Sequence, residues 1–208
     1  ILDGETIVTA STYADDIKSD SRYDEYYNWH FINMELDEDY EDTVPSEKGD
    51  VFIAINKCLD ILESDSVTDS EKSFYLKLLI HFIGDLHQPM HIGRYEDRGG
   101  NRVYVKWFGR NSNLHRVWDS EMINGYNMSY SELAKNLPTP EKLEIEFERD
   151  DVIGWVNEIH SYTRNIYKDV SSGDNLGYEY QYKNFPTVKD LILKGGLRLA
   201  ALLNYLFD

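Results

Sequence analysis

The 208-residue chain contains one cysteine, no long apolar run and few basic side chains. A single cysteine cannot form an internal disulfide, and Cys58, within the apolar stretch VFIAINKCLDIL, is expected to be a small core residue. The apolar runs are too short to cross a bilayer, so we expect a soluble chain. With 21 Lys and Arg against 38 Asp and Glu, the net charge is −17. This balance argues against binding of duplex nucleic acid through cationic side chains, although bound metal ions could supply positive charge.

Hydrophobic residues recur mainly at helical spacing. Residues 47–64 carry apolar side chains along one helix face, which predicts a helix there. A second apolar stripe follows the capping-box pattern TDSE at 68–71 and runs to Pro89, where proline ends the helix. Asn113 is a suitable cap for a further helix that extends to about Ile123.

The second half of the chain is also predicted to be helical. SYSELAKNL indicates a short helix, and residues 141–170 indicate a long helix with a polar face. Residues 171–186 are rich in Ser, Gly, Asn and Tyr, which predicts a loop. Residues 187–207 then predict a final amphipathic helix, in which Gly195 and Gly196 indicate close packing of another helix.

One segment alternates in the manner of a strand. GGNRVYVKWFG places Val103, Val105 and Trp107 at every second position after a glycine turn, which predicts a short β ribbon. The chain has no internal repeat, low-complexity segment or domain linker. We therefore expect residues 1–208 to form one mainly α-helical domain.

Three of the six histidines fall within HFIGDLHQPMH, residues 81–91. His81 and Asp85 are four residues apart and share a helix face, and His115 and Asp119 repeat this spacing. His91 follows the first pair closely enough for a turn to bring it back towards Asp85. A single such pair is more often a cap or a salt bridge. Two pairs and a third histidine predict a metal site, because imidazole and carboxylate are good zinc ligands.

Two other histidines, His87 and His160, have simpler interpretations. His87 lies six residues after His81 and points about 120° away from it on a helix, so we do not expect it to be a ligand. His160 stands alone in NEIHSYT. Both are expected to be surface histidines or histidines whose hydrogen bonds are satisfied.

The stretch FIGDLHQPMHIGRYEDRGGNRVYVKWFGRNSNLHRVWD closely resembles the core of the zinc-dependent, single-strand-specific nucleases of the S1/P1 family. TYADDIK, WHFIN and GGLRLAALLN resemble three other segments of these nucleases, so the similarity covers most of the chain. The resemblance implies a single helical domain of the phospholipase C and single-strand nuclease type. It also implies a cluster of three zinc ions at the bottom of a cleft.

The resemblance assigns metal ligands residue by residue. One zinc ion would be held by Asp15, His30, His81 and Asp85. A second would be held by His91, His115 and Asp119. Asp15 is preferred to the neighbouring Asp16 because it matches the aspartate of the family's WAD segment. Without the resemblance, Asp15 would be interpreted as a helix cap and His30 as a core histidine.

The start of the chain departs from the family pattern. In the family a third zinc ion is bound by the amino group and carbonyl of an N-terminal tryptophan, a nearby histidine and the aspartate matching Asp85. The chain opens ILDGETIVTAS, which contains neither the tryptophan nor the histidine. We therefore expect about thirty residues of the family pattern to be missing and two zinc ions to be bound.

The resemblance also implies catalytic and substrate-binding residues. Asp15 would orient the attacking water, and Lys18 would stabilise the charge that develops in the transition state. Without the resemblance, Lys18 would be interpreted as a solvated surface lysine. Phe31 would stack on an unpaired base, which favours single strands; its alternative role is core packing. The base edge would be contacted by Asn33, Gly99 and Asn101.

The expected activity is hydrolysis of single-stranded DNA and RNA to 5′-phosphate products, with 3′-nucleotidase activity. Single-stranded nucleic acid is the expected partner, with no membrane and no obligate protein partner. The family is exported, which implies a periplasmic or secreted protein. Two alternatives remain, a zinc phospholipase C-type phosphodiesterase and a truncated homologue that binds zinc without catalysis.

Overall fold

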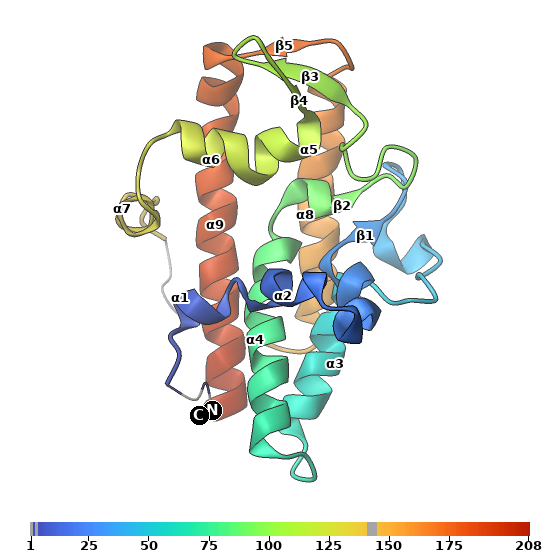
Figure 1. The fold of residues 1–208 in the computed structure, drawn as a ribbon, viewed down its shortest axis with the longest axis vertical. Helices are drawn as coiled ribbons and strands as arrows, with labels where there is room; N and C mark the ends of the chain where they lie inside the picture. Colours follow the sequence, from blue (N-terminus) through green and yellow to red (C-terminus); the bar gives the residue numbers. More distant parts are fainter. Residues whose placement is uncertain (1, 3, 141–144) are drawn as a thin grey trace.

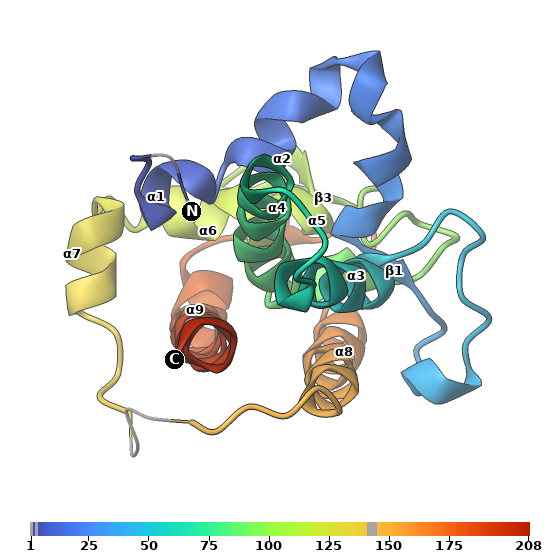
Figure 2. The same cartoon turned by 90° about the horizontal axis from the view of Figure 1, so that it is seen from below.

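Four long helices run side by side in the computed structural model, which describes residues 2, 4–140 and 145–208 (Figure 1). They are α3 (Val51–Glu63), α4 (Asp69–Leu86), α8 (Asp151–Asp169) and α9 (Tyr178–Phe207). Seen along their axes, α4 and α3 lie over α9 and α8 (Figure 2). The predicted mainly α-helical fold is therefore confirmed. In the part of the chain that the structure describes, no helix is both long and apolar enough to span a bilayer.

The two helices predicted in the first half begin at polar caps. The Asp50 carboxylate accepts the Ile53 N–H at 3.0 Å and caps α3. The Thr68 hydroxyl accepts the Glu71 N–H at 3.3 Å and caps α4, as TDSE predicts. Such caps satisfy backbone donors that have no partner within the helix. Helix α4 ends at Leu86, just before Pro89.

Short helical elements make up the part of the chain before α3. They are α1 (Ile7–Ala10), α2 (Tyr13–Asp16), η1 (Ile17–Ser19), η2 (Ser21–His30) and η3 (Tyr40–Asp42). Helix α2 crosses in front of α4 in Figure 1, α1 lies to its left, and both contact α4. Strand β1 (Ile32–Asn33) pairs in parallel with β2 (Ile92–Gly93), which follows the 3-10 turn η4 (Pro89–His91). This pairing brings the end of η2 beside the end of α4.

The predicted β ribbon is present. Strands β3 (Tyr104–Trp107) and β4 (Arg110–Asn113) form an antiparallel hairpin, and β5 (Asn175–Leu176) joins β3 in parallel. The Asn113 side chain caps the helical segment that follows, as expected. That segment is not regular; it consists of α5 (Leu114–Arg116), the π-helical turn η5 (Val117–Glu121) and α6 (Met122–Gly125). The capping box of Ser129 and Glu132 begins α7 (Tyr130–Lys135).

Buried apolar residues form two clusters. The larger one lies between α3, α4, α8 and α9 and includes Leu59, Phe82 and Ile159, and Cys58 is fully buried in it as predicted. The smaller one lies beneath the ribbon and includes Trp107. The ribbon and the long helices thus hold the segment between α4 and η5 from two sides.

The predicted boundaries of the last two helices are wrong. Helix α8 begins at Asp151, and Phe147 packs as a buried side chain outside it; residues 141–144 lie outside the described residues. The predicted loop 171–186 contains β5 and the first turns of α9. The local composition was misleading because tertiary contacts hold these turns in place. The Tyr180 hydroxyl accepts the Trp118 N–H at 2.8 Å, and Phe185 stacks on Tyr126 at 4.1 Å between ring centroids.

Only one of the two glycines in α9 is closely packed. A Cβ added to Gly195 would lie 3.2 Å from the His87 ring, whereas one added to Gly196 would meet no atom within 4 Å. The neighbour of Gly195 is the C-cap of α4, so the end of another helix does pack closely at this glycine, as predicted, but not at Gly196. The His87 ring is held there, because its Nδ1–H donates to the Ile83 carbonyl and its Nε2 accepts from Arg198.

The two glycines provide a matched test of this packing. Gly196→Ala should raise the free energy of unfolding by about 0.5–1 kcal/mol, because alanine has less backbone entropy to lose in a helix. Gly195→Ala gains the same propensity but must displace the buried His87 ring. Urea denaturation should therefore find Gly195→Ala less stable than Gly196→Ala, and equal stabilities would contradict the close packing.

Candidate metal centre

All seven predicted ligands converge where α2, η2, α4, η4 and α5–η5 meet. Asp15 comes from α2, His30 ends η2, and His81 and Asp85 lie one turn apart on α4. His91 ends the turn after α4. His115 and Asp119 come from α5 and η5. The convergence depends on the β1–β2 pairing and on the ribbon, because these elements fold distant parts of the chain onto the C-terminal half of α4.

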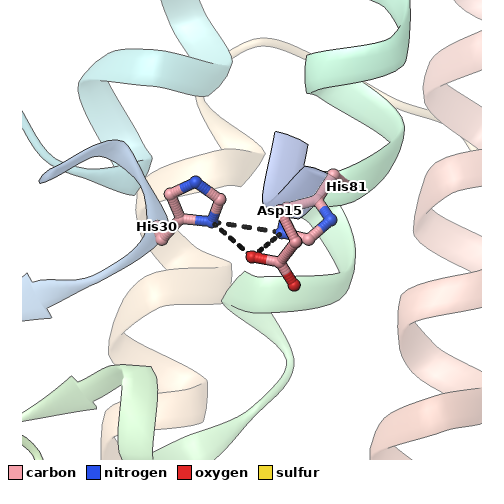
Figure 3. Close-up of side chains that lie close together, drawn as sticks. All are labelled: Asp15, His30 and His81. Carbon is pink, nitrogen blue, oxygen red and sulfur yellow. Dashed lines mark hydrogen bonds and ion pairs between the residues drawn. The ribbon is translucent and has the colours of Figure 1, made fainter. Parts of the chain in front are cut away.

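A first group of donors is formed by Asp15, His30 and His81, which point towards one another (Figure 3). The Asp15 Oδ1 lies 3.9 Å from His30 Nδ1 and 3.7 Å from His81 Nε2, and the two nitrogens are 3.1 Å apart. Asp85 Oδ2 adjoins this group, at 2.7 Å from His30 Nδ1 and 2.9 Å from His81 Nε2. A tetrahedral zinc site places its donors about 3.3–3.4 Å apart, within the range of these distances.

A second group is formed by His91, His115 and Asp119, whose donor atoms all lie within 4.8 Å of one another. The His91 Nε2 lies 3.6 Å from Asp119 Oδ1. The His91 and His115 rings are stacked, with centroids 5.2 Å apart and planes at 21°. The Gln88 amide donates to Asp119 at 3.4 Å, which restrains that carboxylate.

Asp85 links the two groups through its two oxygens. Its Oδ2 belongs to the first group, and its Oδ1 lies 3.2 Å from His91 Nδ1. The side chain is only 11% exposed. Burial alone would raise the pKa of this carboxyl, but the surrounding histidines outweigh burial and hold its pKa well below the ordinary range. Asp85 is therefore a shared anion at the middle of the cluster.

Two of the histidines are held in a form that suits a metal. His81 Nδ1 lies 2.6 Å from the Ser11 carbonyl, and His115 Nδ1 lies 2.8 Å from the Gly99 carbonyl. A carbonyl can only accept, so each Nδ1 carries the proton and, in the neutral ring, each Nε2 has a free lone pair. Metal-binding histidines are commonly fixed by such a hydrogen bond from the other ring nitrogen.

The donor atoms of the cluster fit a cation. With Nδ1–H directed at Ser11, the neutral His81 ring would present a lone pair to Asp85 Oδ2 at 2.9 Å, and two acceptors repel. Burial acts to lower the pKa of His81, yet Asp85 outweighs it and raises the pKa. His91 Nδ1 is buried without a properly aligned hydrogen bond. A metal ion would supply the positive charge and satisfy these nitrogens.

The cluster is buried on one side and open on the other. The side chains of His30 and His81 are 5% and 8% exposed, whereas those of Asp15 and Asp119 are 58% and 46% exposed. Lys18 stands at the open edge, where its ammonium lies 2.6 Å from Asp15 Oδ1. The exposed side of the cluster therefore carries Asp15, Asp119 and Lys18.

The predicted substrate-binding residues lie on two adjoining segments. Asn33 of β1 is paired with Gly93 of β2, and a Cβ on Gly93 would lie 2.6 Å from the Gly99 Cα. Asn33 and the Gly99 loop therefore flank the same strand end. Phe31 is half-buried immediately before β1. The Asn101 amide is exposed but donates to the Arg98 carbonyl at 3.0 Å, so its side chain is held within its own loop.

The sequence did not point to the groups that support the ligands. Three groups contact the ligands or the loop beside them: the Gln88 amide, the Ser11 carbonyl and the buried Asp97 carboxylate. None of them belongs to a sequence pattern typical of a metal site. An aspartate two residues before Gly-Gly is a signal of a turn, and Asp97 stabilises such a turn by accepting the Gly100 N–H. His87 and His160, which were not expected to be ligands, belong to neither group; both are buried and hydrogen-bonded.

The known proteins to which the chain is similar are nucleases by name. A family model described as S1/P1 nuclease matches residues 2–208. The chain is 34% identical to Endonuclease 4 of Arabidopsis thaliana over 164 residues, which are 70% of this chain and 54% of that protein. It is 36% identical to Endonuclease 1 of the same plant over 64% of this chain and 49% of that protein. It is 28% identical to Nuclease S1 of Aspergillus oryzae over 95% and 78%. The chain thus spans about half the length of the two plant relatives.

The sharing of Asp85 predicts how metal binding responds to substitution. Asp85→Asn should weaken zinc binding at both groups, whereas Asp119→Asn should weaken it only at the second. Zinc content after gel filtration and calorimetric titration would measure this, with Asp16→Asn as a matched control next to Asp15. Two unaltered zinc sites in Asp85→Asn would show that its carboxylate does not link the groups.

Proposed function

This chain belongs to the S1/P1 nuclease family, and on that premise we propose that it is a zinc-dependent phosphodiesterase that cleaves single-stranded DNA and RNA to 5′-phosphate products. The observation that carries the proposal is the presence of two clusters of imidazole and carboxylate donors, with the Asp85 carboxylate lying between them. By the same family resemblance we infer 3′-nucleotidase activity and export to the periplasm or the medium. Zinc is the metal that best suits this mixture of nitrogen and oxygen donors.

The charge of the donor set explains how so acidic a protein would hold a phosphate. Asp15, Asp85 and Asp119 contribute three negative charges, and the imidazoles that bind metal are neutral. Two divalent ions would reverse the sign of this local charge. The cluster would then attract a phosphodiester even though the chain carries a net charge of −17.

The residues at the open edge would act on the substrate. Zinc ions in the two groups would stabilise charge on the phosphoryl oxygens and supply a more acidic water as nucleophile. Asp15, more than half exposed, would orient that water by accepting its hydrogen bond. Lys18, whose ammonium already contacts Asp15, would place its positive charge beside the phosphoryl oxygens, where charge develops in the transition state.

The preference for single strands follows from the way a base would be held. Phe31 directly follows His30, so its ring would stack on a base adjoining the scissile phosphate. Only an unpaired base exposes its face for stacking, which is worth about 1–3 kcal/mol per base. Asn33 and the Gly99 loop, which flank one strand end, would contact the base edge. We expect Asn101 to assist once its amide leaves the Arg98 carbonyl.

Activity assays separate the roles of these residues. With zinc-loaded protein and a single-stranded oligonucleotide, Lys18→Met should lower kcat about 100-fold with little change in KM, because its charge acts mainly in the transition state. Phe31→Ala should instead raise KM by about tenfold, because it removes ground-state stacking. Lys135→Met, at an exposed lysine of α7, should behave as the unaltered protein.

The same preparation decides between the proposed function and its alternatives. Zinc-loaded protein should cleave single-stranded DNA much faster than the matched duplex and leave 5′-phosphates. Release of phosphorylcholine from phosphatidylcholine, without cleavage of the oligonucleotide, would establish a phospholipase C-type enzyme instead. Two bound zinc ions with neither activity would leave a zinc-binding protein without catalysis.

A further inference from the structure

The carboxylate of Asp97 accepts four hydrogen bonds in the loop between β2 and β3. The Gly100 N–H and the Tyr167 hydroxyl both donate to Oδ1 at 2.7 Å. Arg94 donates to Oδ2 through Nε at 3.0 Å and Nη2 at 2.5 Å. The side chain is only 10% exposed, so the carboxylate is satisfied by protein donors from both its own loop and α8.

One peptide group connects this carboxylate to a candidate metal ligand. The Gly100 N–H that binds Asp97 and the Gly99 carbonyl that binds His115 belong to the same peptide unit. The Asp97 carboxylate, this peptide and the imidazole therefore form a continuous hydrogen-bonded chain. The His115 Nδ1 is at one end of the peptide and Asp97 Oδ1 is at the other.

The peptide has little freedom to take another orientation. Gly99 and Gly100 have φ angles of +58° and +81°, which disfavour side chains. A Cβ on Gly99 would lie 2.2 Å from the Met90 carbonyl oxygen, and one on Gly100 would lie 3.2 Å from the His115 backbone nitrogen. Backbone on both sides thus packs directly against the glycines, and Asp97 fixes which way their shared peptide faces.

A carboxylate at one end of a peptide changes the other end. Hydrogen bonds in a chain polarise one another, by about 10–30% per bond, so the Gly99 carbonyl becomes a stronger acceptor for His115 Nδ1–H. A stronger acceptor at Nδ1 holds the proton there and leaves the Nε2 lone pair for a metal. Metal-binding histidines often donate directly to a carboxylate for the same purpose, and here a peptide lies between the two.

We propose that Asp97 is a positioning residue of the second metal group, which acts through the Gly99–Gly100 peptide to fix the orientation and tautomer of His115. This inference rests on the proposed metal centre, but it does not depend on which phosphodiester, if any, the protein cleaves. Tyr167 and Arg94 hold the carboxylate in place. They do not contact the peptide through which it acts.

Zinc affinity tests this role. Asp97→Asn should weaken zinc binding at the second group by about 10–100-fold, the usual cost of losing a partner that orients a ligand. Chelator competition in an Asp15→Asn background, where the first group is impaired, would isolate that affinity. Tyr167→Phe is the matched control, because it removes one donor from the same Oδ1 but leaves the bond to Gly100, and its affinity should stay close to that of the background.

The tautomer of His115 gives a readout that a purely structural role would not change. Imidazole ¹⁵N spectra of the metal-free protein at pH 8 should show the Nδ1–H form in the unaltered chain and in Tyr167→Phe, and a mixture in Asp97→Asn. Unchanged zinc affinity together with an unchanged tautomer in Asp97→Asn would overturn the proposal. If that variant does not fold, an Nε2–H form in the unaltered chain would overturn it equally. Absence of nuclease activity would leave both readouts intact, so the two failures are distinguishable.

Discussion

The structure depends on one buried carboxylate shared between two sets of histidines. Asp85 lies within 3.2 Å of ring nitrogens of His30, His81 and His91, and its side chain is almost wholly enclosed. A buried carboxylate destabilises the fold unless positive charge lies next to it. Neutral imidazoles provide hydrogen bonds but no net positive charge. The same requirement makes the site suitable for metal ions. The carboxylate that destabilises an empty cluster becomes the link that holds two cations close together.

The fold serves this constraint by bringing four separate segments to the end of one helix. Helix α4 supplies His81 and Asp85, η2 brings His30 beside them, and the parallel β1–β2 pair keeps η2 in place. Strand β4 of the ribbon leads directly into α5, which places His115 in the cluster, and the Gly99 carbonyl fixes the orientation of its ring. Backbone carbonyls, and Asp97 behind one of them, therefore decide which nitrogen His81 and His115 present, and the long helices bury the rest. The proposed hydrolysis would take place on the exposed side of the cluster, which carries Asp15, Lys18 and Asp119.

Sequence reasoning predicted what depends on local spacing and missed what depends on distant contacts. The four-residue spacing of His81 and Asp85 places both on one face of α4, and the structure agrees. Asp15 and His30 have no such pattern and were identified only through the family resemblance. The first turns of α9 were mistaken for a loop, because Tyr180 and Phe185 are held by partners far away in the sequence. The contribution of Asp97 runs through a peptide in a glycine turn, and no residue pattern encodes that geometry.

Anomalous diffraction at the zinc edge, from crystals of the zinc-loaded protein, tests the central claim most directly. We predict one peak within bonding distance of Asp15, His30, His81 and Asp85, and a second within bonding distance of His91, His115 and Asp119. The two peaks should lie on opposite sides of the Asp85 carboxylate. Zinc bound elsewhere on the molecule, or a single ion that ignores one of the two groups, would contradict the account.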